Sequence, residues 1–348
     1  MDFADIFADP AWFPDRIDPG NRLVRLVRTS HHILASSAFL DGRTPLSIAG
    51  ADPLIVGLDA FIEHAPPAPP MRWIFHESFC GSTLLARMLT IGGRSLCLRE
   101  PQILVDLAMW RTTLGEADRT IYQAGVSATL AHLSRRWNPG EVIAIKPTNW
   151  INPEIAEFWA PTRGDRAAFV QIPAEDFLIA VLRGGRDRIA YTLRFYERAA
   201  ESWPAIARIV EATMPAADDV MVRAAYLVVA AHWAQRCLLE AARAGSEPGK
   251  AIRIDFPDFL TRDAQVAAVV ACLGLDVSTE QRAFSIAVHL PHHAKQPDRP
   301  SPSASESRAN DTIRTLHAAA IEAAAAFAKR IEQERGTTVV ALGAAGVG

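Results

Sequence analysis

The sequence predicts an α/β protein in which a parallel β-sheet lies between two layers of helices. Apolar runs of strand length alternate along the chain with longer segments of helical periodicity, the pattern typical of such three-layer sheets. Polar side chains follow several of these runs at the point where each strand ends. The length of 348 residues fits one large α/β domain with additions, or two domains.

Five apolar runs are the predicted strands, at residues 73–75, 95–98, 141–145, 177–182 and 251–255. Helical periodicity between and after them predicts helices at residues 103–110, 119–137, 187–200, 203–213, 220–244, 263–273, 279–287 and 312–335. Residues 1–70 are expected to be an N-terminal extension with a strand at 23–27, which ends in a proline-rich linker. Residues 71–335 are the predicted main domain, and residues 336–348 are expected to be a flexible tail.

Composition limits the kinds of partner. Charged residues make up 22% of the chain and the net charge is −3, so no general basic field indicates binding to nucleic acid. The four cysteines lack CxxC spacing, which argues against a disulfide framework or a zinc site. The acidic N-terminus lacks a signal-peptide core, and the apolar stretch 220–231 is too short to span a bilayer. We therefore expect a cytoplasmic protein without a membrane span.

The segment RWIFHESFCGSTLLARMLT, residues 72–90, reads as a strand, a turn of small residues and a helix. Such a turn aims backbone N–H groups and the positive end of a helix dipole at one point, which suits phosphate or sulfate. The segment is not a Walker A loop, because Ser82 stands where that motif has lysine. A turn that merely packs a helix is the alternative. The predicted anion-binding residues are Ser78, Cys80, Gly81, Ser82, Thr83 and Leu84.

Polar residues at the ends of the predicted strands form the second group of candidates. Glu100, Lys146, Arg183 and Asp255 each follow or end an apolar run. Ligands of open α/β sheets bind at the carboxyl ends of the strands, so these residues are expected to converge. Each has a simpler interpretation: Glu100 as an acid at a helix start, Lys146 as a surface lysine, and Arg183 as part of a solvated surface.

The turn resembles the phosphosulfate-binding loop of the sulfotransferase family, whose pattern is roughly [RK]-[ST]-G-[TS]-[ST]. Cys80, Gly81, Ser82 and Thr83 cover its small residues, and Phe79 stands at the position of the family's Lys or Arg. Glu100, nineteen residues after Gly81, resembles the general base of tyrosine-protein sulfotransferases.

Three later segments extend the resemblance. LRGGRDRIAYTLRFY is similar to the family segment in which an Arg at a strand end and a Ser eight residues later bind the 3′-phosphate. Arg183 takes the first position, and Tyr191 with Thr192 beside it takes the second. Residues 251–275 read RIDF…CLGL, which resembles the family's late RYEDL…FLGL segment. Lys295 lies where the family has a basic loop over the nucleotide.

The resemblance implies a P-loop nucleotide-binding, sulfotransferase-like fold and a 3′-phosphoadenosine 5′-phosphosulfate donor. It implies sulfuryl transfer to a hydroxyl or amine of a small-molecule or peptide acceptor, with no metal. Glu100 is the expected base, and Lys146 is expected to stabilise charge on the leaving phosphate. Two alternatives stay open: a P-loop kinase or other nucleotide-binding enzyme using ATP, and a non-catalytic protein with a degenerate nucleotide site. The acceptor and the oligomeric state are not encoded in any recognisable pattern.

Overall fold

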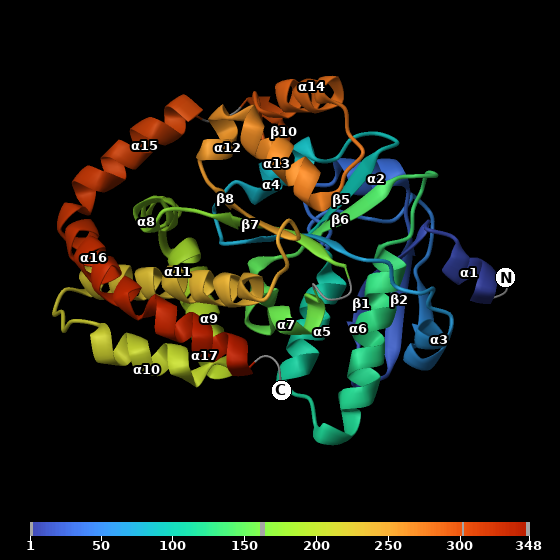
Figure 1. Ribbon diagram of the computed structural model, residues 1–348, viewed down its shortest axis with the longest axis horizontal. Coiled ribbons are helices and arrows are strands. Elements are labelled where there is room, and N and C mark those ends of the chain that lie inside the picture. Colours follow the sequence, from blue (N-terminus) through green and yellow to red (C-terminus); the bar gives the residue numbers. More distant parts are fainter. Residues whose placement is uncertain (1–2, 161–163, 301–302, 346–348) are drawn as a thin grey trace.

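A computed structural model describes residues 3–160, 164–300 and 303–345 of the chain. Its centre is a five-stranded, all-parallel sheet flanked by helices (Figure 1). The strand order is β5-β6-β4-β7-β8, so the first strand of the sheet is central. The strands are β4 (Arg72–His76), β5 (Ser95–Arg99), β6 (Val142–Lys146), β7 (Arg166–Gln171) and β8 (Ala251–Asp255).

The order of the strands places a topological switch point beside β4. After β4 the chain builds β5 and β6 on one side, and it later builds β7 and β8 on the other. In open parallel sheets, the crevice outside the carboxyl ends of the strands at such a point is where ligands bind. The turn after β4 therefore lies at the place where the topology favours a site.

Side chains of the central strands alternate between two hydrophobic cores, one on each face of the sheet. In β4, Ile74 belongs to the first core, whereas Trp73 and Phe75 belong to the second. Cys97 of β5 and Ala144 of β6 likewise enter the first core, while their neighbours enter the second. This period of two, with apolar residues on both faces, is what makes buried parallel strands read as continuous apolar runs.

Helices cover both faces of the sheet (Figure 1). On the first face lie α4 (Ser82–Met88) and α13 (Asp263–Leu273), and on the second lie α5 (Gln102–Thr112), α6 (Arg119–Leu133) and α7 (Ile155–Phe158). The first core extends into α8 (Ala174–Arg183), α9 (Gly185–Ser202), α10 (Pro204–Thr213), α11 (Val220–Ala244) and α16 (Ala318–Ile331). The remaining helices are α1 (Phe3–Ala8), α2 (His31–Ser36), α3 (Leu58–Glu63), α12 (Asp258–Thr261), α14 (Thr279–His289), α15 (Ser303–Leu316) and α17 (Arg335–Ala345).

The N-terminal residues form a folded layer of their own. Strands β1 (Trp12–Asp18), β2 (Leu23–Arg28) and β3 (Leu54–Gly57) make an antiparallel sheet whose apolar side chains join the second core. Arg99, fully buried at the end of β5, donates hydrogen bonds to the carbonyl oxygens of Leu34, Ala35 and Ser37 at 2.8–2.9 Å. These are carbonyls at the C-terminal end of α2, which have no partner within the helix. One guanidinium thus fastens the N-terminal layer to the central sheet.

One predicted strand is wrong. Residues 177–182 lie in helix α8, and the fourth strand is β7, an unpredicted run of six residues. The apolar run FLIAVL is compatible with a buried helix as well as a strand. Pro173 directly before the helix, with Glu175 and Asp176 in its first turn, is the helix-start pattern that decides between them.

Residues 336–345 also differ from the expectation of a flexible tail. They belong to α17, in which the side chains of Thr338 and Leu342 are buried. Helix α17 packs against α11, so its apolar face is covered. Residues 346–348 lie outside the described residues. Within residues 3–160, 164–300 and 303–345, no helix is both long enough and apolar enough to cross a membrane.

The anchoring role of Arg99 predicts a stability effect. In Arg99→Met the carbonyls at the end of α2 lose a buried, charged donor, and we expect a loss of about 3 kcal/mol in the free energy of unfolding. Urea unfolding followed by circular dichroism measures it. Arg94→Met, at the exposed residue directly before the same strand, is the control and should change stability by less than about 0.5 kcal/mol. Equal stability of the two variants would contradict the anchoring role.

Candidate functional site

The carboxyl ends of β4, β5 and β6 meet at one edge of the sheet. Arg99 and Lys146 are paired in register, and the next amide, that of Glu100, donates to the Lys146 carbonyl at 2.6 Å. His76 at the end of β4 joins this edge, because one ring nitrogen contacts the Pro147 carbonyl oxygen at 2.9 Å. Burial, and secondarily the charge of Lys146, lower the pKa of His76 to about 4, so its ring is neutral at pH 7. Glu100 and Lys146, both candidates from the sequence, are therefore neighbours.

Glu100 and Lys146 form an ion pair through Oε1 and Nζ. The Lys146 side chain is 1% exposed and the Glu100 side chain is 14% exposed, so the pair is largely removed from water. Glu100 has a φ of +58°, a conformation that side-chain-bearing residues rarely adopt. Holding a glutamate there costs on the order of 1–3 kcal/mol, and such conformations cluster at functional sites.

Two opposing effects set the charge of Glu100. Burial alone would raise the pKa of its carboxyl group, but the positive groups around it, Lys146 foremost, outweigh burial and hold the pKa below the ordinary value. Arg43 contributes from the N-terminal layer, where its Nη2 lies 3.3 Å from Oε2 of Glu100. At neutral pH Glu100 is thus a carboxylate held by two cations.

The two cations hold Glu100 with different strength. Breaking a buried pair such as that with Lys146 costs about 3–5 kcal/mol, because it leaves an unpaired buried charge. The Arg43 side chain is 56% exposed, and exposed pairs contribute about 0–1 kcal/mol. Lys146 is therefore the fixed partner of Glu100, and Arg43 is the exchangeable one.

The turn after β4 is held by a buried ionic network. Glu77 is fully buried, and its carboxylate accepts from the Ile172 amide at 2.7 Å and from Arg236 Nε at 3.1 Å. His232 lies 3.3 Å from the same carboxylate. These contacts fix the turn to the end of β7 and to α11.

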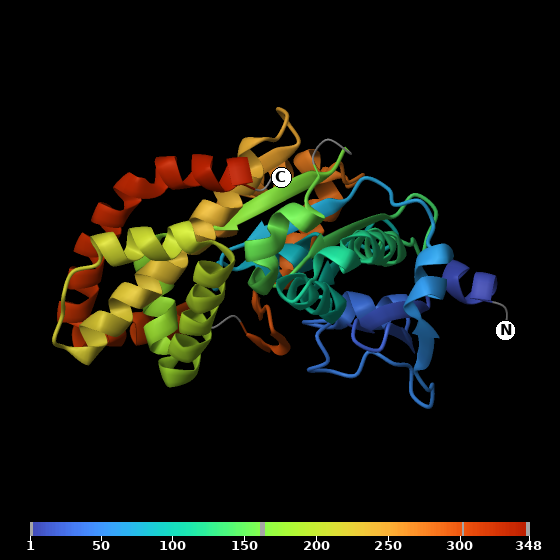
Figure 2. The same ribbon diagram turned by 90° about the horizontal axis from the view of Figure 1, so that it is seen from below.

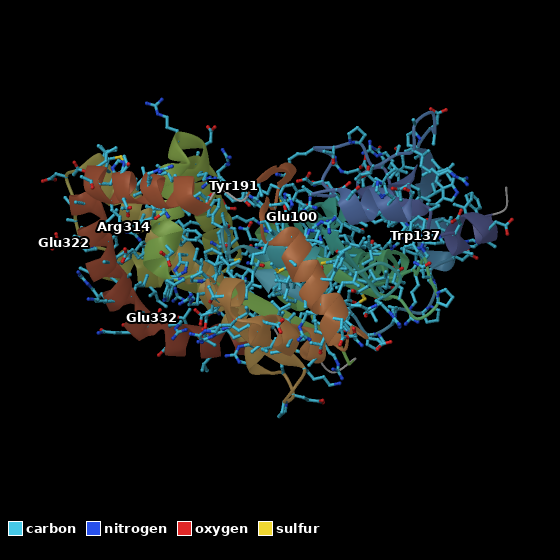
Figure 3. The ribbon with its side chains drawn as sticks, turned by 90° about the horizontal axis from the view of Figure 1, so that it is seen from above. Glu100, Trp137, Tyr191, Arg314, Glu322 and Glu332 are labelled. Atoms are coloured by element: carbon cyan, nitrogen blue, oxygen red, sulfur yellow. The ribbon has the colours of Figure 1, made fainter. Side chains whose placement is uncertain are left out.

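A second network, of hydrogen bonds, includes Ser78 and Tyr191. The Ser78 amide and hydroxyl both donate to Oε1 of Gln235, at 3.0 and 3.2 Å. Asn149 donates to the same oxygen and accepts from the Tyr191 hydroxyl at 2.6 Å. Ser78 is therefore bound to protein rather than directed at a ligand. Burial and the charge of Glu100 raise the pKa of Tyr191, which lies near that carboxylate (Figure 3).

Gly81 is required by the shape of the turn. It has a φ of +71°, and a Cβ atom at this position would lie 2.9 Å from the ring of Phe256. The Phe256 ring belongs to the RIDF segment, so that segment packs directly on the turn. Cys80 beside it is buried, which raises the pKa of its thiol to about 12 and leaves it protonated at neutral pH. Ser82 and Thr83 begin α4 with buried side chains, and Leu84 packs against the first core.

Phe79 fills the position where the resembling family has a cation. Its ring centre lies 5.7 Å from that of Phe177 and 6.5 Å from that of Tyr191. The Arg188 guanidinium lies over the ring, 5.1 Å from its centre, a distance at which a cation and an aromatic ring attract each other. A positive charge therefore reaches the turn from α9, although none comes from the turn itself.

Arg183 does not end a strand at this edge of the sheet. Because residues 177–182 are helical, Arg183 ends a helix instead of a strand, and it donates to Asn310 at 2.7 Å and to Glu306 at 3.2 Å. Thr192 is buried and donates to the Arg188 carbonyl oxygen one turn earlier in α9. Both side chains therefore have partners within the protein, and the strand end from which the role of Arg183 was predicted is absent.

Lys295 does reach the site, together with residues that the sequence did not indicate. Its Nζ lies 5.6 Å from the ring centre of Phe39, and the Arg43 guanidinium lies 3.7 Å from the same centre. Burial lowers the pKa of Lys295, as do Lys146, Arg188 and Arg43, whereas the charge of Glu100 raises it. Three other cations thus act on Lys295, and the Glu100 carboxylate partly offsets them. No periodicity or motif marks Phe39 or Arg43, because the contact depends on tertiary folding alone.

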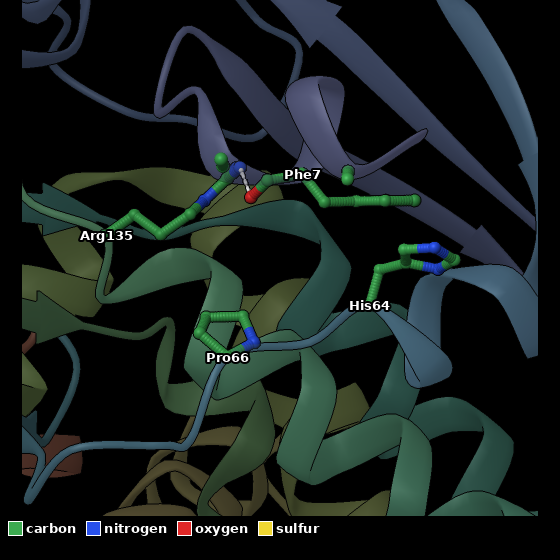
Figure 4. A pocket seen from close by; sticks show the side chains of 6 residues that line it. Phe7, His64, Pro66 and Arg135 are labelled. Atoms are coloured by element: carbon green, nitrogen blue, oxygen red, sulfur yellow. Dashed lines mark hydrogen bonds between the residues drawn. The ribbon is translucent and has the colours of Figure 1, made fainter. Parts of the chain in front are cut away.

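A hollow of about 300 Å³ lies elsewhere, at the N-terminal layer (Figure 4). Arg135 donates there to the carbonyl oxygens of Phe7 and Asp9, at 2.7 and 2.9 Å. Its lining residues are Ala4, Phe7, Ala8, His64, Pro66 and Arg135, and none of them is a candidate from the sequence. Across the described part of the chain, no group of three His, Cys, Asp or Glu side chains is arranged to hold a metal ion.

Comparison with models of known protein families gives no match for this chain, and comparison with curated proteins gives none either. The functional interpretation therefore depends on the geometry of the site and on the resemblance of its motifs.

The buried ion pair predicts a pH-dependent effect of Lys146→Met. At pH 7 the variant should lose about 3 kcal/mol of unfolding free energy, because Glu100 keeps its charge without its main partner. The pKa of Glu100 is lowered in the folded wild type, so the pair stabilises the protein above the ordinary carboxyl pKa and is lost as pH falls through the lowered value. The stability difference should therefore narrow from pH 7 to pH 3.

Urea unfolding at several pH values measures this difference, with the exposed Lys329→Met as control. A difference that stays constant over that range would show that Lys146 stabilises the fold without acting through the charge of Glu100.

Proposed function

We propose that this protein transfers a sulfuryl group from 3′-phosphoadenosine 5′-phosphosulfate to a hydroxyl or amine acceptor. The observation that carries the proposal is the Glu100–Lys146 pair at the carboxyl edge of the sheet. Arg43 contacts Glu100, and Lys295 interacts with both members of the pair and with Arg188. A carboxylate is the kind of group that accepts a proton from an alcohol. A cluster of cations is the kind of environment that binds a polyanionic donor.

The position of the turn supports a P-loop type of nucleotide-binding fold. It joins the central strand β4 to α4 at the switch point of the sheet. Backbone amides at the start of a helix have no partner within the helix, and they are available to phosphate oxygens. Cys80, Gly81, Ser82 and Thr83 supply such amides in the proposed complex, whereas Ser78 is held by Gln235.

The proposed reaction is an in-line displacement at sulfur. The acceptor oxygen or nitrogen forms a bond to sulfur while the bond between sulfur and the bridging phosphate oxygen breaks. The acceptor's proton passes to Glu100, and adenosine 3′,5′-bisphosphate leaves with the electron pair of the broken bond. Negative charge develops on the bridging oxygen, where Lys146 stabilises it. The Arg188 guanidinium over Phe79 supplies positive charge at the turn.

Phe79 favours one other function, a site that binds nucleotide without catalysis. Its ring is packed against Phe177 and occupies the place of the family's cation, so the charge must come from neighbouring elements. Binding and turnover are therefore tested separately.

The first experiment compares ligands by thermal denaturation. Adenosine 3′,5′-bisphosphate at about 100 times its dissociation constant should stabilise the protein by about 2.7 kcal/mol. ATP with magnesium and AMP should stabilise it far less, because neither carries the 3′-phosphate. Stabilisation by ATP–magnesium alone would favour the kinase alternative, and no response to any nucleotide would overturn the proposal.

The second experiment separates catalysis from binding in Glu100→Gln. We expect turnover to fall about 10²–10⁴-fold, since glutamine cannot accept the proton. Affinity for the bisphosphate should stay equal or rise, because a negative charge near the anion is removed. Release of bisphosphate from the phosphosulfate donor, measured with a panel of phenols, alcohols and amines, reports turnover. Unchanged turnover with an active acceptor would eliminate Glu100 as the base.

A further inference from the structure

Two segments from distant parts of the chain meet over Glu100. The Arg43 guanidinium and the Lys295 ammonium contact the ring of Phe39, at 3.7 and 5.6 Å from its centre. Phe39 is 8% exposed, so the ring itself is part of the protein interior. The strand β10 (Gln296–Pro300), which follows Lys295, lies in a hairpin that extends beside the N-terminal segment (Figure 2). Two cations therefore lie against one aromatic ring.

The backbone of both segments is fixed to the central domain. The Leu40 amide donates to the Arg99 carbonyl at 2.7 Å, and the Gln102 amide donates to the Leu40 carbonyl at 3.0 Å. Arg87 of α4 donates to the Ala294 carbonyl at 2.6 Å and to the Ser36 carbonyl at 3.3 Å. Arg87 thus holds both segments on the helix that follows the turn. Arg43 and Lys295 stand beside the site because of these anchors.

Arg43 is placed to change partners. Its Nε donates to Asp41 at 2.6 Å, which keeps the guanidinium in this region, while its Nη2 lies 3.3 Å from Glu100. The second contact is long and solvent-exposed, in contrast to the buried contact of Glu100 with Lys146. A small rotation of the Arg43 guanidinium would therefore release Glu100 and leave the buried ion pair between Glu100 and Lys146 intact.

Charge around this point favours an anion. Among the described groups that act on Glu100, Arg43 or Lys295, the positive ones are Arg43, Lys146, Arg188 and Lys295, whereas Glu100 and Asp41 are negative. A surplus of two positive charges remains, in a chain whose net charge is −3. Arginine binds phosphate and sulfate through paired N–H donors, and it does so more strongly than it binds an exposed carboxylate in a long contact.

We propose that Arg43 is an exchange residue: it binds Glu100 in the free protein and turns, with Lys295, to a phosphate or sulfate group of the bound ligand. The exchange releases one oxygen of Glu100 only when the anion is present. The proposal deepens the proposed function and rests on it, because it couples anion binding to the availability of the base. It also assigns a functional role to the N-terminal layer.

A double-mutant cycle tests the exchange. Isothermal titration calorimetry measures the affinity for adenosine 3′,5′-bisphosphate in wild type, Arg43→Gln, Glu100→Gln and the double variant. Arg43→Gln should weaken binding roughly tenfold, and Arg43→Lys should recover part of the loss. Glu100→Gln should strengthen binding about fivefold when Arg43 is present, because the anion no longer competes for it. In the Arg43→Gln background the gain should be less than about twofold.

The matched control is Arg94→Gln. Arg94 has a similarly exposed side chain, 49%, and an exposed carboxylate partner in Asp276, but it precedes β5 and so lies at the opposite edge of the same sheet. Its affinity for the bisphosphate should equal that of wild type. Equal gains from Glu100→Gln in both backgrounds would overturn the exchange, even if Arg43→Gln itself weakened binding.

Further titrations separate this proposal from the proposed function. With AMP in place of the bisphosphate, an effect of Arg43→Gln that disappears assigns Arg43 to the 3′-phosphate, and an effect that persists assigns it to the 5′-phosphate side. If wild type does not bind the bisphosphate, the proposed function fails, and the cycle is measured with pyrophosphate. The same non-additive pattern with pyrophosphate would support the exchange by itself, and absence of binding to both anions would overturn it.

Discussion

The contact between Glu100 and Lys146 is the one on which the candidate site depends. It exists because β5 and β6 are neighbouring parallel strands that end in register at the same edge of the sheet. Lys146 is buried there, and a buried ammonium requires a carboxylate partner. The left-handed backbone at Glu100 meets that requirement, since it lets the amide and the side chain of Glu100 both reach Lys146. The turn after β4 and the surrounding cations are arranged about this pair.

Regions outside the central sheet complete the site. The N-terminal layer contributes Phe39 and Arg43, the segment after α14 contributes Lys295, and α9 contributes Arg188. Buried polar contacts hold these elements in place, among them the hydrogen bonds of Arg99 and Arg87 to backbone carbonyls. Residues 1–70 are therefore integral to the architecture, although they are separate from the sheet in the order of the chain. The division into an extension, residues 1–70, and a main domain follows the order of the sequence. In the folded protein the two parts share one hydrophobic core.

The sequence predicted the central strands well, because a parallel strand buried on both faces reads as an uninterrupted apolar run. The pattern does not mark β7, because its run RAAFVQ is short and begins and ends with polar residues, and it predicts a strand in the apolar run of α8 instead. The predicted ligand role of Arg183 depends on the same strand, and Arg183 ends helix α8 instead. Glu100 and Lys146 are predictable from the sequence, because each directly follows or ends a strand. Arg43 is not predictable in this way, since its partner Glu100 is 57 residues away in the sequence and no pattern connects the two.

Arg87 joins segments that are far apart in the order of synthesis, since its guanidinium holds the carbonyls of both Ser36 and Ala294. The sheet needs β8 at residues 251–255 before it is complete, and the wall around Glu100 also needs Lys295. Contacts of such large sequence separation form late in folding, because the entropy of closing a long loop must be overcome first. During synthesis, the chain therefore contains Glu100 long before it contains the last of the cations at the candidate site. The group of charges at this edge of the sheet is consequently complete only after Lys295 has been synthesised.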